Sequence, residues 1–317
     1  MEHLTYVPQR DGYGKGLLQL CQEQKPILVL DADVSASTRT AWVREKYPEQ
    51  FINVGISEQD LVGMAAGLAL GGITPFVSTY GVFLSGRAWD QIRTTVCYNN
   101  LNVKFGGAHA GISVGPDGAT HQALEDIAIT RVLPNMTVLA PCDWLETKKA
   151  VLAAEQWPGP VYIRFGREAV PTITQEKTPF QIGKARVLCQ GTDVALIACG
   201  AMVYHAQEAA RLLAKEGISC QVVDLHTIKP LDEACLLDCA QRCGAIVTAE
   251  EHQLAGGMGS AVAEFLALHC PVPMEMVGVH DRFGQSGQPE ELMEQYGLTF
   301  REIVQNAHKV LSRKQEG

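Results

Sequence analysis

The chain has 317 residues, a length that indicates about two domains, and 46% of them are hydrophobic, as in an ordinary globular protein. With 35 acidic and 26 basic residues the formal charge is −9, which argues against a nucleic-acid partner. No run approaches the ~18 apolar residues of a membrane helix, and the first residues, MEHLTYVPQRDGYG, contain no apolar signal core. Ten cysteines lie scattered in apolar segments, so we expect reduced thiols and a cytoplasmic location.

Strand-like and helix-like segments alternate in the first half of the chain. This alternation predicts a mainly parallel sheet with helices on both faces, and ligands bind such sheets outside the carboxyl ends of the strands. Ser57 is the expected N-cap of one helix, with Asp60 three residues on. The predicted strands are 26–34, 51–56, 74–82, 102–108, 136–141 and 160–165, and the predicted helices are 57–72, 83–99, 123–133 and 143–156.

A polar segment with two prolines, residues 167–186, then breaks the pattern and predicts a linker over the surface. It separates a first domain, 1–166, from a second α/β domain, 187–317. The second domain has predicted strands at 193–199, 219–225, 245–250 and 273–279, and predicted helices at 204–217 and 259–270.

Several motifs along nearly the whole chain resemble transketolases. They are FINVGISEQDLVGMAAGLALGG, GPDGATHQALED, LPNMTVLAPCDWLE, PVYIRFGRE, HTIKPLD and TAEEHQLAGGMGSAV, and they occur in the family's order. The resemblance implies a pyrimidine-binding domain followed by a transketolase C-terminal domain, the last two of the three domains of a full transketolase. The remaining domain carries a Gly-Asp-Gly motif that holds Mg²⁺ and the cofactor diphosphate, and no Gly-Asp-Gly occurs in these 317 residues.

The chain therefore looks like the C-terminal subunit of a split transketolase, an enzyme that moves a two-carbon ketol unit from a ketose to an aldose. Deoxyxylulose-phosphate synthases share the NVGISEQ-type motif, usually in one long chain. The β subunits of 2-oxo acid dehydrogenases match in length, but their corresponding loop usually carries a His-Ser-Gln-type motif where this chain has Asp-Gly-Ala-Thr-His-Gln. A non-catalytic scaffold of the same fold is a third alternative.

The resemblance assigns Glu58 to atom N1′ of the aminopyrimidine of thiamine diphosphate. Loss of the thiazolium C2 proton is assisted by the 4′-amino group, and the required tautomer needs a proton shared at N1′. A carboxyl in an apolar cleft can supply that proton near neutral pH. The alternative for Glu58 is an acid that only complements the helix dipole.

Aromatic residues follow in VSTYGVFLSGRAWDQ. Tyr80 and Phe83 match positions that flank the aminopyrimidine ring, and Trp89 is expected to pack in the core. The chain departs from many transketolases at Gly86, where they have an aromatic residue, so we expect a looser cleft or a side filled by a partner. Asp33 matches an acid near the cofactor, although it could equally cap a loop.

The loop GPDGATHQ is expected to line the substrate channel. By resemblance, Asp117 senses a donor hydroxyl, His121 bonds hydroxyls near the reacting carbonyl, and His109 lies closer to the phosphate end. Sugar hydroxyls need buried partners, and a site built for them rejects analogues that lack the hydroxyl.

An anionic sugar also needs a binding site for its charged end. Arg164, at the end of a predicted strand, and Ser37 match residues that bind the sugar phosphate, and Arg10 matches a second arginine. A planar guanidinium suits phosphate or sulfonate oxygens alike, so these residues do not distinguish phosphosugars from sulfosugars. The alternative for Arg164 is an ion pair with Glu168.

We expect no metal ligands in this chain. Cys235, Cys239 and Cys243 recur every four residues but form no Cys-x-x-Cys pair, so a packed helix face is expected. The GGMGS segment at 256–260 lacks the Lys of a P-loop and is expected to be a turn before a helix, and His252 is expected near a subunit interface.

By resemblance, thiamine diphosphate and Mg²⁺ (or another divalent ion) bind with a diphosphate-binding partner chain. We expect a homodimer core of two such chains within a heterotetramer.

Overall fold

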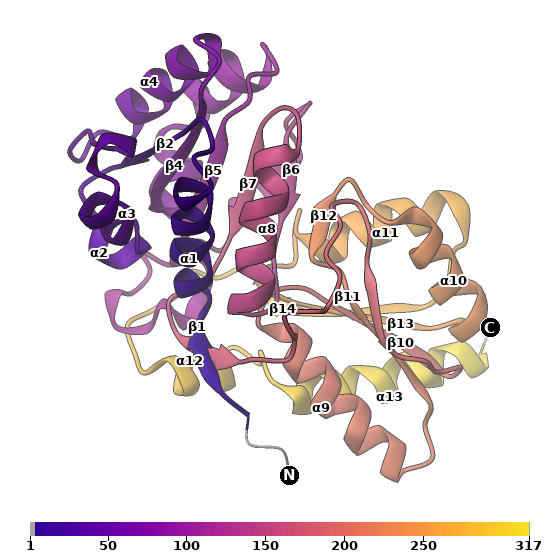
Figure 1. Ribbon diagram of the computed structural model, residues 1–317. Helices are drawn as coiled ribbons and strands as arrows, with labels where there is room; N and C mark the ends of the chain where they lie inside the picture. Colours follow the sequence, from indigo (N-terminus) through magenta and orange to yellow (C-terminus); the bar gives the residue numbers. More distant parts are fainter. Residues whose placement is uncertain (1–3, 317) are drawn as a thin grey trace.

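A seven-stranded sheet forms the centre of the first domain in the computed structural model, which describes residues 4–316 (Figure 1). The strand order is β12-β6-β7-β5-β4-β2-β3, and every strand except β12 runs parallel to its neighbours. All six parallel strands lie within the segments that the sequence predicts. They are β2 (Ile27–Asp31), β3 (Phe51–Asn53), β4 (Thr74–Tyr80), β5 (Lys104–Ala108), β6 (Thr137–Leu139) and β7 (Val161–Arg164).

Helices cover both faces of this sheet. On one face, α1 (Gln9–Gln22) packs against α8 (Trp144–Gln156), and the backbones come so close that a Cβ on Gly12 would overlap the carbonyl oxygen of Trp144. The sequence analysis missed α1 because its three glycines weaken the helical pattern, yet those glycines permit the close approach. α4 (Glu58–Leu70) buries its apolar side in the core on the other face.

The helix predicted at 83–99 is broken into three parts, which corrects the prediction of one continuous helix. They are α5 (Gly81–Arg87), α6 (Trp89–Gln91) and a π-helical segment, η2 (Ile92–Cys97). Trp89 packs against the core and its indole N–H donates to the carbonyl of Ile129 at 2.7 Å. The short elements of this domain are β1 (Tyr6–Pro8), α2 (Ser35–Thr38), α3 (Ala41–Lys46), η1 (Pro48–Gln50), η3 (Ile112–Asp117), α7 (Asp126–Arg131) and β8 (Ala169–Pro171).

The second domain is a five-stranded sheet of order β14-β13-β10-β11-β9, in which only the edge strand β9 is antiparallel. Figure 1 shows α10 and α11 on one side of this sheet and α9 and α13 on the other. The bounds are β9 (Arg186–Cys189), β10 (Val194–Ala198), α9 (Met202–Lys215), β11 (Cys220–Asp224), β12 (Thr227–Lys229), α10 (Glu233–Cys243), β13 (Ile246–Gln253), α11 (Met258–His269), β14 (Met274–Val279), α12 (Pro289–Gln295) and α13 (Phe300–Glu316).

The two domains share structure at their junction. β12 follows the second domain's β11 in sequence but pairs antiparallel with β6, so it forms the edge of the first domain's sheet. The linker predicted at 167–186 is shorter in the structure. Near its start β8 pairs with β1, and at its end Arg186 begins β9. Between these ends the linker is anchored, since Asp143 accepts hydrogen bonds from the backbone N–H groups of Ile173 and Thr174.

Within residues 4–316, no helix combines the length and the apolar character needed to cross a membrane.

Candidate functional site

The predicted site residues gather at the carboxyl edge of the first sheet. Tyr80 is the last residue of β4, His109 directly follows β5, and Ser37 lies in α2 after β2. Glu58 begins α4, which follows β3. Because these strands are parallel, their carboxyl ends meet on one edge, where open α/β sheets bind ligands.

Four rings form what we call the aromatic cleft: Tyr80, Phe83, His109 and His121. The ring of Tyr80 stacks on that of His109 with centroids 4.5 Å apart, and His121 presents its ring edge-on to Phe83 at 5.1 Å. The Tyr80 hydroxyl donates to the Ser37 hydroxyl at 3.1 Å. The cleft therefore offers flat apolar faces next to polar atoms, as a heterocyclic ligand requires.

His109 is held neutral beside a cationic partner. Its side chain is buried, and burial, followed by the charges of Arg10 and Arg167, lowers its pKa to about 3. Atom Nε2 lies 3.4 Å from Nη1 of Arg10 and must accept, because arginine only donates. The ring proton is therefore on Nδ1, which finds no hydrogen-bond partner within residues 4–316, and neither does Nε of Arg10. Two buried donors thus remain for ligand oxygens.

Glu58 is only 2% exposed and lies at the positive end of α4. Nη1 of Arg87 donates to its Oε2 at 2.8 Å. Ser57 is the N-cap, as predicted, but its hydroxyl donates to the carbonyl of Val54 at 3.0 Å and does not cap the helix. The first-turn acid is therefore a buried carboxylate beside a cation, not only a dipole complement.

Asp117 ends η3 and pairs with an arginine that the sequence analysis did not select. Its Oδ2 lies 3.2 Å from Nη1 of Arg167, which also donates to the carbonyl of Val114. Arg167 follows β7 in a loop and lies near enough to His109 to lower its pKa. The structure thus brings Arg10 and Arg167 together with the predicted channel residues.

Arg164 has a different environment from the one predicted. Its Nε donates to both oxygens of the buried Asp126 at 3.0–3.1 Å, and its Nη2 donates to the carbonyls of Ala123 and Glu251. Burial alone would lower the pKa of Arg164, but Asp126 and Glu251 raise it above its usual value. The guanidinium is engaged at the domain junction, and its ion pair is with Asp126, not with Glu168. We therefore leave Arg164 out of the proposed ligand site.

Replacing Arg164 by alanine is expected to destabilise the chain by about 3–5 kcal/mol, because Asp126 would keep a buried charge without its partner. Urea unfolding of the two proteins measures the difference. Arg167→Ala, at a partly exposed position three residues further on, is the matched control and should cost less than about 1 kcal/mol. Equal, small effects of the two substitutions would contradict the structural role of Arg164.

Two further predicted positions lie at the margin of the site. Asp33 is exposed and accepts a hydrogen bond from Nδ2 of Asn53 at 2.8 Å, a contact between the loop after β2 and the last residue of β3. A Cβ built on Gly86 would meet no atom within 4 Å. The absent aromatic side chain thus leaves open space on that side of the cleft.

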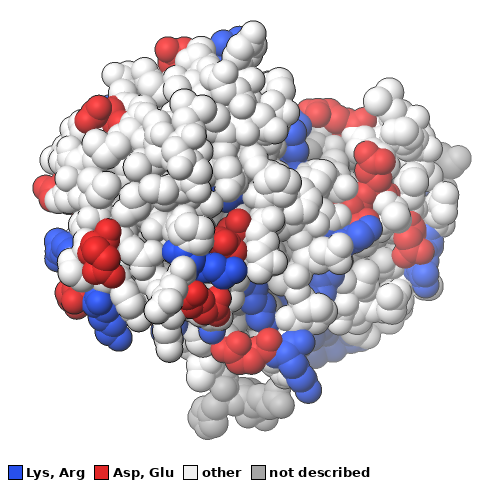
Figure 2. Space-filling model, turned by 45° about the horizontal axis from the view of Figure 1, so that its top comes forward, with Lys and Arg blue, Asp and Glu red and all other residues white. Residues whose placement is uncertain are grey.

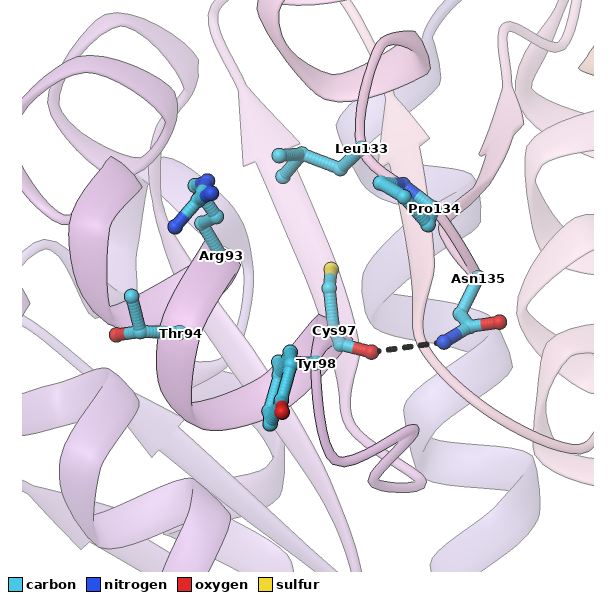
Figure 3. A pocket seen from close by; sticks show the side chains of 7 residues that line it. All are labelled: Arg93, Thr94, Cys97, Tyr98, Leu133, Pro134 and Asn135. Carbon is cyan, nitrogen blue, oxygen red and sulfur yellow. Dashed lines mark hydrogen bonds between the residues drawn. The ribbon is translucent and has the colours of Figure 1, made fainter.

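A cavity of about 450 Å³ lies at the opposite, amino-terminal edge of the same sheet (Figure 3). Arg93 is the sole charged residue of its lining. The side-chain amide of Asn135 donates to the carbonyl of Cys97. This lining contains no carboxyl group and no histidine. The lining residues are Arg93, Thr94, Cys97, Tyr98, Leu133, Pro134 and Asn135.

Other polar motifs have structural roles in the second domain. Glu250 accepts hydrogen bonds from the N–H groups of Met258 and Gly259 at the start of α11, and burial raises its pKa to about 7. Of the GGMGS segment, Gly256 and Gly257 form the predicted turn, whereas residues 258–260 already belong to α11. His252 is buried in the chain, where its Nε2 accepts a hydrogen bond from the backbone N–H of Ala128, and its place near a subunit interface stays a prediction.

One group of side chains resembles a metal site. Among residues 4–316, the ligand atoms of Cys142, Glu146 and Asp224 lie within 4.8 Å of one another, and all three residues are buried. Nη2 of Arg186 lies 3.0 Å from Asp224 and 4.0 Å from Glu146. The guanidinium already supplies the positive charge that a metal ion would bring. Cys239 and Cys243 lie instead in the core, on the buried face of α10.

The fold and the site define a class of protein: a two-domain, mainly parallel α/β subunit with a ligand cleft at the carboxyl edge of its first sheet. Comparison with known proteins is more specific. Residues 6–172 match the model of the transketolase pyrimidine binding domain, and residues 183–303 match that of the transketolase C-terminal domain. The chain belongs to the transketolase family, whose proteins use thiamine diphosphate.

Its relatives include subunits of similar length. The chain is 42% identical to the putative transketolase C-terminal section of Methanocaldococcus jannaschii, over 98% of both chains. It is 42% identical to the 6-deoxy-6-sulfo-D-fructose transketolase subunit of Clostridium sp. (strain MSTE9), over 96% of this chain and 95% of that one. A solved structure described as a split gene transketolase, inactive beta4 tetramer, is 48% identical, with a TM-score of 0.92 over 97% of this chain and 99% of that chain. The chain is thus a split transketolase-type subunit.

Proposed function

We propose that this chain supplies the pyrimidine half of a thiamine-diphosphate site and catalyses, with a partner chain, transfer of a two-carbon ketol unit from an anionic ketose to an aldose. The observation that carries the proposal is the buried Glu58 carboxylate beside the aromatic cleft, on the sheet edge that also holds His109 and Arg10. A non-catalytic scaffold would have no need to keep this combination.

The cleft fits an aminopyrimidine. When bound between Glu58 and the aromatic rings, the cofactor would supply the nucleophilic carbon chemistry that transfer of a two-carbon unit needs. Glu58 shares a proton with N1′ and holds the ring in the reactive tautomer. Tyr80 and Phe83 provide the flat faces against which such a ring packs, with a stacking contribution of about 0.5–1.5 kcal/mol beyond burial. Asp33 is exposed and accepts a hydrogen bond from Asn53, so we assign it a role in shaping the neighbouring loop and no contact with the cofactor.

The polar side of the cleft fits a sugar. The unpaired Nδ1–H of His109 donates to a substrate oxygen, and His121 and Asp117 bind hydroxyls near the reacting carbonyl. Ser37, Arg10 and Arg167 receive the anionic end, where charge-assisted hydrogen bonds are strongest. The Clostridium relative is named for a sulfosugar, and a sulfonate presents the same three oxygens as a phosphate, so both classes of ketose are candidate donors.

A second chain is needed to complete the site, because the cofactor's diphosphate requires Mg²⁺, and residues 4–316 place no cluster of three or more possible metal ligands at the cleft. Apolar side chains are exposed at both ends of α4, with Ile56, two residues before Glu58, at 76% and Leu70, the last residue of the helix, at 75%. Figure 2 shows few charged side chains over the upper left of the molecule, on the side of the first domain. These features support an apolar interface near the cofactor half-site.

We infer a heterotetramer of two such chains and two diphosphate-binding chains, with a homodimer of this chain at its core. The interface is expected at the obligate end of the range, roughly 2,000–5,000 Å². The split gene relative supports this arrangement, because its tetramer of β chains alone is described as inactive.

The substrate assignment is tested in the assembled complex with phosphorylated, sulfonated and uncharged ketoses, by measuring the shortened aldose product. Arg167→Ala and Arg10→Ala should each raise KM for an anionic ketose roughly 10- to 100-fold, because each removes charge-assisted hydrogen bonds, and should change KM for an uncharged ketose much less. Arg93→Ala, at the opposite edge of the sheet, is the control.

Equal effects of Arg167→Ala on charged and uncharged ketoses would reject the anion-binding role. Turnover of 2-oxo acids in place of ketoses would favour a 2-oxo acid dehydrogenase-type subunit instead.

A further inference from the structure

Arg87 makes two of the contacts that the proposed function gives to the aminopyrimidine ring. Its guanidinium carbon lies 4.6 Å from the centre of the Phe83 ring, and its Nη1 donates to Oε2 of Glu58 at 2.8 Å. A guanidinium is flat, stacks on aromatic faces and carries N–H donors in a fixed fork. In these respects it resembles a protonated aminopyrimidine.

We propose that Arg87 is an internal occupant of the pyrimidine half-site, and that it must leave Glu58 and Phe83 before the cofactor's aminopyrimidine can bind. This inference rests on the proposed function, because it assigns the same carboxylate and the same ring to the cofactor. The ligand class in question is an aminopyrimidine, and the competing group is a side chain of the same subunit.

The local structure explains how Arg87 reaches this position. Arg87 is the last residue of α5, and Gly86 before it leaves open space where many transketolases have an aromatic side chain. The planar group that borders this side of the cleft is thus the guanidinium of the next residue. This chain therefore has a glycine at position 86 in place of the family's aromatic residue, and the next residue, Arg87, contacts Glu58, the proposed cofactor-binding acid.

The charges explain why the contact forms in the free chain. Glu58 is almost fully buried, and a buried carboxylate without a partner is costly. Arg87 compensates this charge, while its own side chain is 49% exposed and can swing into solvent without breaking core packing. A ring that packs on Phe83 and shares a proton with Glu58 would take the space in which the guanidinium lies, so the two groups compete for one position.

The consequence is a competition between the chain and its cofactor. In the isolated subunit the guanidinium protects the carboxylate. When the partner chain holds the diphosphate, the aminopyrimidine is delivered at high effective concentration and displaces Arg87. Cofactor affinity is then lower than the contacts of the bound ring alone would give, because the Arg87 contacts must first be broken.

The test measures the Kd of thiamine diphosphate, with Mg²⁺ in excess, by calorimetry on the complex of this chain with its diphosphate-binding chain. Arg87→Met keeps the length of the side chain and removes both contacts, and it should bind the cofactor roughly 3- to 30-fold more tightly than the unmodified protein. Arg87→Lys keeps the charge without the flat fork and should lie between the two. Circular dichroism melting curves check that each variant folds.

A second pair of variants makes the result specific. In a Glu58→Gln background the guanidinium no longer meets a charge, so adding Arg87→Met should change Kd less than about twofold. Unchanged or weaker binding by Arg87→Met in the Glu58 protein would overturn the proposal and leave the proposed function standing. A complex of the unmodified chains that binds no thiamine diphosphate would overturn both.

Discussion

Glu58→Gln is expected to lower kcat of the assembled enzyme by roughly 10²- to 10⁴-fold, the range for loss of a group that transfers or shares a proton in the reaction. The amide has nearly the shape of the carboxyl but cannot exchange a proton with N1′. The substitution should leave the fold intact, because the amide fills the same volume and removes only the charge of the ion pair with Arg87. Steady-state kinetics with a ketose donor, together with a melting curve, measure both effects.

Asp60→Asn is the matched control for this substitution. Asp60 lies in the same first turn of α4 and complements the same helix dipole, but its side chain is exposed. If Glu58 served only the dipole, the two variants would lose similar, small amounts of stability and activity. Near-normal turnover by Glu58→Gln or by Glu58→Ala would remove Glu58 from the reaction.

The isolated chain is expected to bind thiamine diphosphate weakly and to turn over no substrate, whereas addition of the diphosphate-binding chain with Mg²⁺ should restore both. The physical reason is the diphosphate, whose charge needs a metal ion, and among residues 4–316 no group of three or more possible metal ligands lies at the aromatic cleft. Calorimetry measures cofactor binding by the chain alone, by its partner alone and by the mixture.

The decisive result for this prediction comes from the chain alone. Tight, Mg²⁺-dependent binding without a partner would show that the cleft is not a half-site. A mixture that binds the cofactor but transfers no two-carbon unit would leave the half-site in place and direct the search to other donors.

The parallel sheet could be predicted from sequence because each strand is a short apolar run bounded by polar turns, as in PILVLD and PVYIRF. α4 was predictable for the same reason, through its N-cap Ser57 and its apolar side. α1 was not, because its glycines give the helix close contact with α8 and at the same time remove the local signal that marks a helix.

The arginines show where local pattern stops being informative. Arg164 and Arg167 lie three residues apart and both look suited to an anion, but the first ends β7 at the domain junction, where the buried Asp126 engages it. Only the second lies in the loop beyond the strand, beside Asp117. Likewise, the contact of Arg87 with Glu58 joins residues that are 29 positions apart, so no local sequence motif indicates it.

The pairing of β12 with β6 makes the covalent connection between the domains partly redundant. A segment of the second domain forms an edge of the first domain's sheet, and the backbone N–H of Gln253 donates to the carbonyl of Leu124 across the same junction. A break in the peptide chain between residues 172 and 182 would leave these pairings in place, so the two halves would stay bound as a non-covalent pair. We therefore expect the whole subunit to unfold cooperatively, because hydrogen bonds join the two domains even where the peptide chain is cut.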